Sequence, residues 1–119
     1  MTSDERFGKR EHLLKSKDFR NVYANGRCLK KGGLALYSMP NGTALNRIGF
    51  AIPARIIKLA SSRNRIRRLL KETYRKNKPE LKAGFDMVVA VKKDFTKKTT
   101  YSDMEKLFLN MTGLAGLAA

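Results

Sequence analysis

Residues 62–78 read SRNRIRRLLKETYRKNK, and the predicted fold is built outward from this stretch. At about 100° per residue, its apolar side chains fall on one side of a helix, which therefore has a single face to bury. These side chains are Ile66, Leu69, Leu70, Thr73 and Tyr74. Pro79 follows as a helix breaker, so we predict one helix from Ser62 to Asn77.

The rest of this predicted helix is cationic. Only one acid, Glu72, accompanies the basic residues of the stretch. The polar residues opposite or beside the apolar side are Asn64, Arg65, Arg67, Arg68, Lys71 and Arg75. Like charges at this spacing destabilise a helix by about 0.2–0.5 kcal/mol per pair, whereas phosphates would neutralise them, and guanidinium groups bind phosphate oxygens bidentately. The pattern favours nucleic-acid binding; a solvated charged face, a membrane-surface helix and a calmodulin-binding helix are the alternatives.

Apolar runs on both sides of the helix indicate strands. Arg47–Ile52 (RIGFAI) precedes it and Phe85–Val91 (FDMVVAV) follows it. The long connection between them allows these two strands to be parallel, and the continuous apolar run of the second is typical of a strand covered on both faces. Further upstream, Gly33–Met39 (GLALYSM) ends at the turn signal Pro40-Asn41-Gly42. We therefore expect residues 33–39 and 47–52 to form an antiparallel hairpin.

Two more helices are predicted near the ends of the chain. Residues 16–26 carry apolar side chains at helical spacing, with Ser16 as the expected N-cap and Gly26 as a left-handed stop. A last helix begins near Ser102, where Ser102 and Glu105 match a capping box. The order of helix, strands, helix, strand and helix predicts an α+β sandwich with helices covering one sheet.

The overall composition agrees with one basic domain. The chain has 119 residues, with 26 Lys and Arg against 10 Asp and Glu, which gives a formal charge of +16. Because a small domain needs a net charge of only about 2–8 for solubility, we expect a polyanionic partner, nucleic acid first and an anionic membrane second. We predict a single domain over 1–119 with flexible ends at 1–12 and 113–119, no membrane span, no secretion signal and a cytoplasmic location.

The chemistry-bearing residues are few. The lone Cys28 excludes a disulfide framework and is expected to be a small buried filler. The acids are scattered: Asp103 and Glu105 are close together only where a helix start favours negative charge, and His12 has no obvious second catalytic group. We therefore predict that no side chain acts as acid, base, nucleophile or principal metal ligand.

Aromatic residues give a second indication of nucleic-acid binding. Phe19, Tyr23 and Tyr37 are expected on one face, because the strand that carries Tyr37 would pack against the first helix. Exposed rings stack on unpaired bases with about 1–3 kcal/mol per base. The alternative is that these rings belong to the core.

The segment Arg63–Leu69 (RNRIRRL), followed by Glu72 and Tyr74, resembles the RNR signature of the bacterial ribonuclease P protein subunit. The similarity extends over nearly the whole chain and in the same order. The matching blocks are Leu14–Tyr23 for the first helix, Leu34–Tyr37 for an aromatic-bearing strand, Arg47–Ile52 for the strand before the basic helix, and Phe85–Val91 with Lys92-Lys93 for the strand after it.

This resemblance implies a fold and a function. The fold is a two-layer sandwich of order α-β-β-β-α-β-α with one mostly antiparallel four-stranded sheet. Its βαβ crossover is left-handed, where general chirality gives a right-handed one in about 98% of cases. The function implied is that of an accessory subunit of a ribonucleoprotein endoribonuclease. A catalytic RNA carries the chemistry, with Mg²⁺ held mainly by that RNA, and removes the 5′ leader of precursor tRNA.

The resemblance also assigns residues. Those that match the family's contacts to the catalytic RNA are Arg63, Asn64, Arg65, Arg67 and Arg68, and the basic face adds Lys71 and Arg75. Those that match its leader-binding cleft are Phe19, Tyr23, Tyr37 and Arg55. One departure is Pro53-Ala54-Arg55, where the family usually has a basic pair and only Arg55 keeps a charge.

The expected partners are the catalytic RNA and precursor tRNA, bound by one protein monomer per RNA and without a membrane. The alternative is a ribosomal or other structural RNA-binding protein. An architectural DNA binder and a protein nuclease are disfavoured, because basic β-arms with apolar wedges and clustered carboxylates are both missing from the sequence.

Overall fold

The structure is a computed structural model that describes residues 11–12, 15–95 and 99–118. The elements follow the order α-β-β-β-α-β-α, as the resemblance implies. They are α1 (Ser16–Asn25), β1 (Arg27–Lys31), β2 (Leu34–Pro40), β3 (Arg47–Ala51), α2 (Ala60–Asn77), the 3-10 turn η2 (Lys78–Glu80), β4 (Phe85–Val91) and α3 (Tyr101–Leu114).

The four strands form one sheet in the order β1-β2-β4-β3. The pairs β1–β2 and β2–β4 are antiparallel, and β3–β4 is parallel, so the predicted parallel pairing across α2 is confirmed. The predicted hairpin between residues 33–39 and 47–52 is wrong, because β4 lies between β2 and β3. Six of the seven residues of β4 are buried, as suits a strand that is covered on both faces and lies in the middle of the sheet.

Strand β1 had no apolar pattern from which to be predicted. Its sequence RCLKK is exposed except for a half-buried Leu29, as suits an edge strand protected by charge. The turn to β2 is Gly32-Gly33, with φ of 59° and 90°, conformations that favour glycine.

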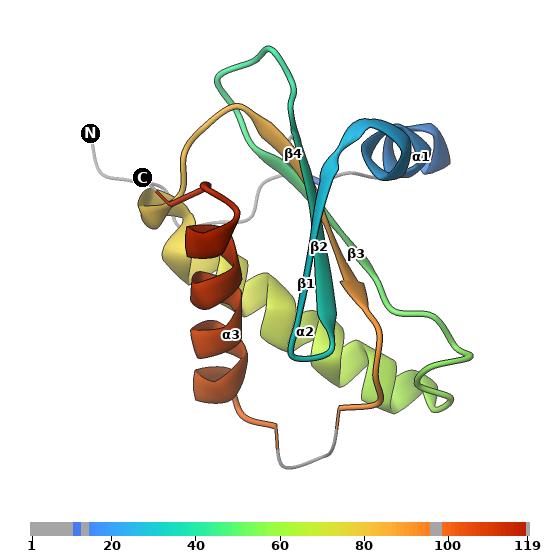
Figure 1. Ribbon diagram of the computed structural model, residues 1–119. Helices are drawn as coiled ribbons and strands as arrows, with labels where there is room; N and C mark the ends of the chain where they lie inside the picture. Colours follow the sequence, from blue (N-terminus) through green and yellow to red (C-terminus); the bar gives the residue numbers. More distant parts are fainter. Residues whose placement is uncertain (1–10, 13–14, 96–98, 119) are drawn as a thin grey trace.

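Helices cover both faces of the sheet, as Figure 1 shows, with α2 and α3 on one face and α1 on the other. The main core lies under α2 and α3. It includes Leu34, Leu36, Ile48, Met87 and Val89 from the strands and Ile66, Leu70, Tyr74 and Phe108 from the helices. A smaller cluster under α1 centres on Val22 and Val88, with Phe19, Tyr37, Met39 and Ala51 around it. The predicted α+β class is confirmed, and the alternation of side chains along β2 and β4 supplies both clusters.

The helix ends differ from those predicted. The residue before α1 is Lys15, with no side-chain cap, so Ser16 begins the helix rather than capping it. Gly26 has φ −83°, which is not left-handed. A glycine is needed at position 26 for a different reason, because the Cβ of any other residue would lie 2.5 Å from the carbonyl oxygen of Val22. In α3 the capping box is formed by Thr100 and Asp103, because the helix begins one residue before Ser102.

Residues 115–118 pack on the domain, whereas we predicted a flexible end at 113–119, of which Ala119 lies outside the described residues. Leu117 is buried, its carbonyl accepts a hydrogen bond from the Lys82 N–H, and Ala118 bridges to Leu81. Of the predicted flexible residues 1–12, the first ten lie outside the described residues. None of the helices within 11–12, 15–95 and 99–118 combines the length and apolarity needed to cross a membrane.

Candidate nucleic-acid interface

Helix α2 is anchored through the side that the sequence predicts. Ile66, Leu70, Thr73 and Tyr74 are buried and Leu69 is half-buried, so the predicted apolar face is confirmed. The outer face of α2 is left for charged groups.

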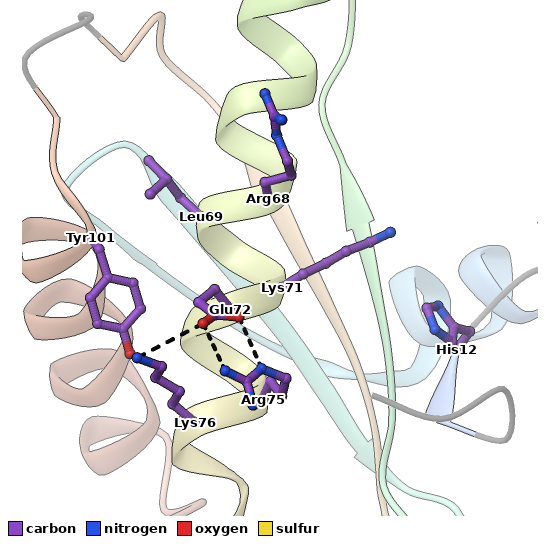
Figure 2. A pocket seen from close by; sticks show the side chains of 8 residues that line it. All are labelled: His12, Arg68, Leu69, Lys71, Glu72, Arg75, Lys76 and Tyr101. Atoms are coloured by element: carbon purple, nitrogen blue, oxygen red, sulfur yellow. Dashed lines mark hydrogen bonds and ion pairs between the residues drawn. The ribbon is translucent and has the colours of Figure 1, made fainter. Parts of the chain in front are cut away.

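Arg68 and Lys71 are the cations that this face offers to a partner. Figure 2 shows both side chains extending from α2 away from Glu72 and Tyr101. Arg68 is exposed, and Lys71 is half-buried. Within the described part of the chain neither has a hydrogen bond or ion pair, and the same holds for the half-buried Arg67 and the exposed Asn64. The three charges and the Asn64 amide are therefore available to phosphates.

Two arginines of the basic segment have structural partners instead. The Nη1 group of Arg63 donates to the carbonyls of Ile57 at 2.9 Å and Lys58 at 2.8 Å. The Nη2 group of Arg65 donates to the carbonyl of Thr99, in the loop before α3. Both residues therefore tie α2 to neighbouring loops, and their contact with RNA stays a prediction.

Arg75 is paired with the one acid of the helix. Its Nε and Nη2 donate to the two carboxylate oxygens of Glu72 at 2.9 and 2.7 Å, and Lys76 lies 3.8 Å from the same group. The hydrogen bonds from Arg75 lower the pKa of Glu72. A phosphate at Arg75 would have to compete with this carboxylate.

A groove of about 820 Å³ follows this part of α2. Its lining residues, shown in Figure 2, are His12, Arg68, Leu69, Lys71, Glu72, Arg75, Lys76 and Tyr101. At one wall of the groove the Tyr101 hydroxyl donates a hydrogen bond to Glu105 at 2.7 Å. Burial, as the larger cause, and this hydrogen bond together raise the pKa of Tyr101 to about 12. The groove is thus cationic, with a neutral tyrosine at its edge.

The predicted aromatic residues come together on the opposite face of the sheet, between α1 and β2. The ring centroids of Tyr23 and Tyr37 are 4.8 Å apart in an edge-to-face contact, and those of Phe19 and Tyr23 are 6.4 Å apart. Tyr23 keeps 41% of its surface exposed, whereas Phe19 and Tyr37 are half-buried. Burial raises the pKa of Tyr23. The pKa of Tyr37 is raised mainly by a hydrogen bond with the neighbouring Cys28 side chain and, to a smaller extent, by burial. Tyrosine hydroxyls are neutral at pH 7 even at their ordinary pKa of about 10, so neither group repels phosphate.

The floor beside these rings is made of small side chains. Ala35, Ala90 and Ala51 are directly paired across β2, β4 and β3. They lie on the same face as Tyr37, because alternate residues of a strand share a face. A cavity of about 300 Å³ opens there, lined by Tyr23, Ala51, Ile52, Pro53, Arg55, Ala90, Val91 and Lys92. We call the three rings and this cavity the aromatic cleft.

Two cations lie at the aromatic cleft, one of which the sequence assignment missed. Arg55 is exposed in the loop after β3, and Lys92 is exposed directly after β4. The parallel pairing of Ala51 with Ala90 brings the ends of these two strands together. Lys92 thus stands beside the position where Pro53-Ala54 replace the family's basic pair. In the sequence, the only indication of a role for Lys92 is the pair Lys92-Lys93 directly after an apolar strand.

A charge network extends from the sheet to the first turn of α1. Arg47 on β3 donates to both carboxylate oxygens of the buried Asp86 at 2.9 and 2.6 Å, and Asn41 donates to the same group at 2.9 Å. The guanidinium also lies 3.9 Å from Asp18 in the first turn of α1. The bonds to Asp86 raise the pKa of Arg47.

Each of the groups considered for catalysis has a structural contact. Asp103 caps α3, and bonds to Thr100 lower its pKa. Glu105 accepts hydrogen bonds from Asn77 and Tyr101, which lower its pKa. His12 forms a bridge with Ile48. Among the residues that the structure describes, no group of three His, Cys, Asp or Glu could hold a metal ion. Cys28 is exposed on β1, so the expected burial is wrong, because β1 is an edge strand.

A cationic helix face and an aromatic cleft on one small α+β domain define a nucleic-acid-binding protein. The sequence model of the family Ribonuclease P matches residues 7–114. The ribonuclease P protein component of Clostridium botulinum is 34% identical over 110 residues, covering 92% of this chain and 97% of that protein. That of a Thermoanaerobacter species is 36% identical over 109 residues, covering 87% and 91%.

Solved structures agree. The ribonuclease P protein of Thermotoga maritima superposes with a TM-score of 0.77 at 26% identity, over 85% of this chain and 94% of that one. That of Staphylococcus aureus has the same fold, with a TM-score of 0.80 at 19% identity over 92% and 98%. The chain belongs to the ribonuclease P protein family. It is therefore a protein subunit of the endoribonuclease that processes the 5′ ends of tRNA.

Proposed function

We propose that this protein bridges two RNA molecules through opposite faces of its sheet. The outer face of α2, with Arg68 and Lys71, binds the catalytic RNA, and the aromatic cleft binds the single-stranded 5′ leader of precursor tRNA. The observation that carries this proposal is that the two sites lie on opposite sides of the sheet. Arg68 and Lys71 on α2 have no partner within the described residues, and the aromatic cleft opens on the side of the sheet that α1 covers.

The aromatic cleft suits an unpaired strand. Tyr23 and Tyr37 provide neutral ring surfaces for bases, and the alanine floor leaves room for a nucleotide beside them. Arg55 and Lys92 supply positive charge for the phosphates at one end. Because mature tRNA has no leader, these contacts would favour substrate over product.

The chemistry is assigned to the RNA. Asp103 caps α3, and Asp86 and Glu72 pair with Arg47 and Arg75, which suits a protein that positions its partners. Magnesium ions bound mainly by the RNA would activate water and stabilise the leaving oxygen. We further propose one protein per catalytic RNA and, since bacterial tRNA is processed where it is made, a cytoplasmic assembly.

Reconstitution tests this assignment. We expect cleavage of precursor tRNA by the RNA with protein at low magnesium, cleavage by the RNA alone only at high magnesium, and none by the protein alone. The measurement is the single-turnover rate for each combination across a magnesium series. Cleavage by the protein alone would show a protein nuclease, and a protein that binds the RNA without any effect on cleavage would be a structural RNA-binding protein.

Tyr37→Ala is expected to weaken binding of precursor tRNA about fivefold, since one lost stacking contact costs ~1 kcal/mol. Binding of mature tRNA should be unchanged, because it lacks the leader. The measurement is the Kd of each tRNA for the reconstituted holoenzyme. Tyr37→Phe, which keeps the ring, is the matched control. Equal weakening of both tRNAs by Tyr37→Ala would contradict a leader site at Tyr37.

A further inference from the structure

The β3–α2 loop, residues 52–59, joins the two RNA-binding faces. It starts at the aromatic cleft, where Pro53 and Arg55 line the cavity, and it ends at Leu59, directly before α2. Any group that fixes this loop therefore affects the position of Arg55.

The core holds only part of the loop. Ile57 is buried and Ile56 packs against the core, and the amides of both donate to the carbonyl of Pro53 at 3.1 and 3.0 Å. The side chains on either side of this pair, Arg55 and Lys58, are exposed. The apolar anchor thus fixes the middle of the loop, and another contact is needed to fix its connection to α2.

Arg63 makes that contact. It lies in the first turns of α2, and one guanidinium nitrogen donates to two successive loop carbonyls, those of Ile57 and Lys58. A charged donor on two carbonyls is a stronger restraint than a neutral hydrogen bond. The geometry also directs this part of Arg63 toward its own chain.

We propose that Arg63 is a positioning residue that clamps the β3–α2 loop and thereby holds Arg55 at the aromatic cleft. Its effect on RNA binding is then mainly on the leader side, although it belongs to the basic segment of α2. The expected effect on leader binding rests on the proposed function. The clamp itself is a property of the protein alone.

Hydrogen exchange on the free protein tests the clamp. The amides of Ile56 and Ile57 report on loop opening because both are hydrogen-bonded within the loop. We expect Arg63→Ala to speed their exchange about tenfold, and Arg68→Ala, which removes the same charge from the same helix, to leave it unchanged. Wild-type exchange in Arg63→Ala would overturn the clamp and leave the proposed function standing.

Binding to the reconstituted holoenzyme tests the consequence, with precursor and mature tRNA as probes. We expect Arg63→Ala to reduce the ratio of precursor to mature affinity about fivefold, and Arg68→Ala to leave that ratio unchanged while weakening the catalytic RNA. In an Arg55→Ala background, Arg63→Ala should have little further effect on the ratio. Additive losses would mean that Arg63 does not act through Arg55 and would overturn the inference.

Arg63→Lys separates the clamp from the charge and serves if Arg63→Ala fails to fold. Lysine keeps the charge on a differently shaped end group, so selectivity should follow loop exchange in this variant. Fast exchange with wild-type selectivity would overturn the inference. A wild-type protein with no preference for precursor tRNA would instead remove the proposed function and the leader-side consequence together.

Discussion

Replacing Arg68 and Lys71 together by alanine should weaken binding of the catalytic RNA about 100-fold, since each charge-assisted contact contributes ~1.5 kcal/mol. Both side chains extend from the outer face of α2 and have no partner among the described residues, so their removal leaves no buried group unpaired. The fold should be unaffected. The measurement is the Kd for the catalytic RNA over a salt series.

The salt dependence identifies the cause. Each lost phosphate contact lowers the slope of log K against log salt by about 0.7–0.9, so this double variant should lose about 1.4–1.8 in slope. The matched control is Lys82→Ala with Lys106→Ala, two exposed lysines outside α2. Both double variants reduce the net charge from +16 to +14. Equal weakening in the two would mean that net charge, and not the outer face of α2, binds the RNA.

Asp86→Ala should lower the free energy of unfolding by about 3 kcal/mol, because it removes one partner of a largely buried ion pair. The Asp86 side chain is 5% exposed and accepts from Arg47 and Asn41. Arg47 keeps 37% exposure, which places the loss at the low end of the range for buried pairs. Urea unfolding measures it, with the exposed Asp94→Ala expected within ~0.5 kcal/mol of the wild type.

A second substitution tests whether the stranded charge is responsible. Adding Arg47→Met to Asp86→Ala removes that charge, so the double variant should recover at least half of the lost stability. Because Arg47 also approaches Asp18 at 3.9 Å, the single variant should loosen α1 and reduce the preference for precursor tRNA. A double variant as unstable as Asp86→Ala would show that packing at Asp86, and not the ion pair, matters.

Local signals in the sequence were sufficient for most elements. Periodicity within one segment predicts the apolar side of α2 and the strand at 85–91. The length of the connection between two segments predicts the parallel pairing across α2. Strand β1 and the position of β4 did not follow. An edge strand carries no apolar pattern, and strand order depends on which strand the whole core can bury.

By itself the sequence determined a basic α+β protein, the cationic outer face of α2 and the aromatic residues of the cleft. Only the tertiary structure decided how the individual cations are used. Arg63 and Arg68 belong to the same basic segment, yet Arg63 binds loop carbonyls, whereas Arg68 extends from α2 and has no partner among the described residues. Lys92 came to the aromatic cleft through the pairing of β3 with β4. The physical reason is that the neighbours of a long side chain depend on which distant segments the tertiary packing brings near it, and local sequence does not specify that packing.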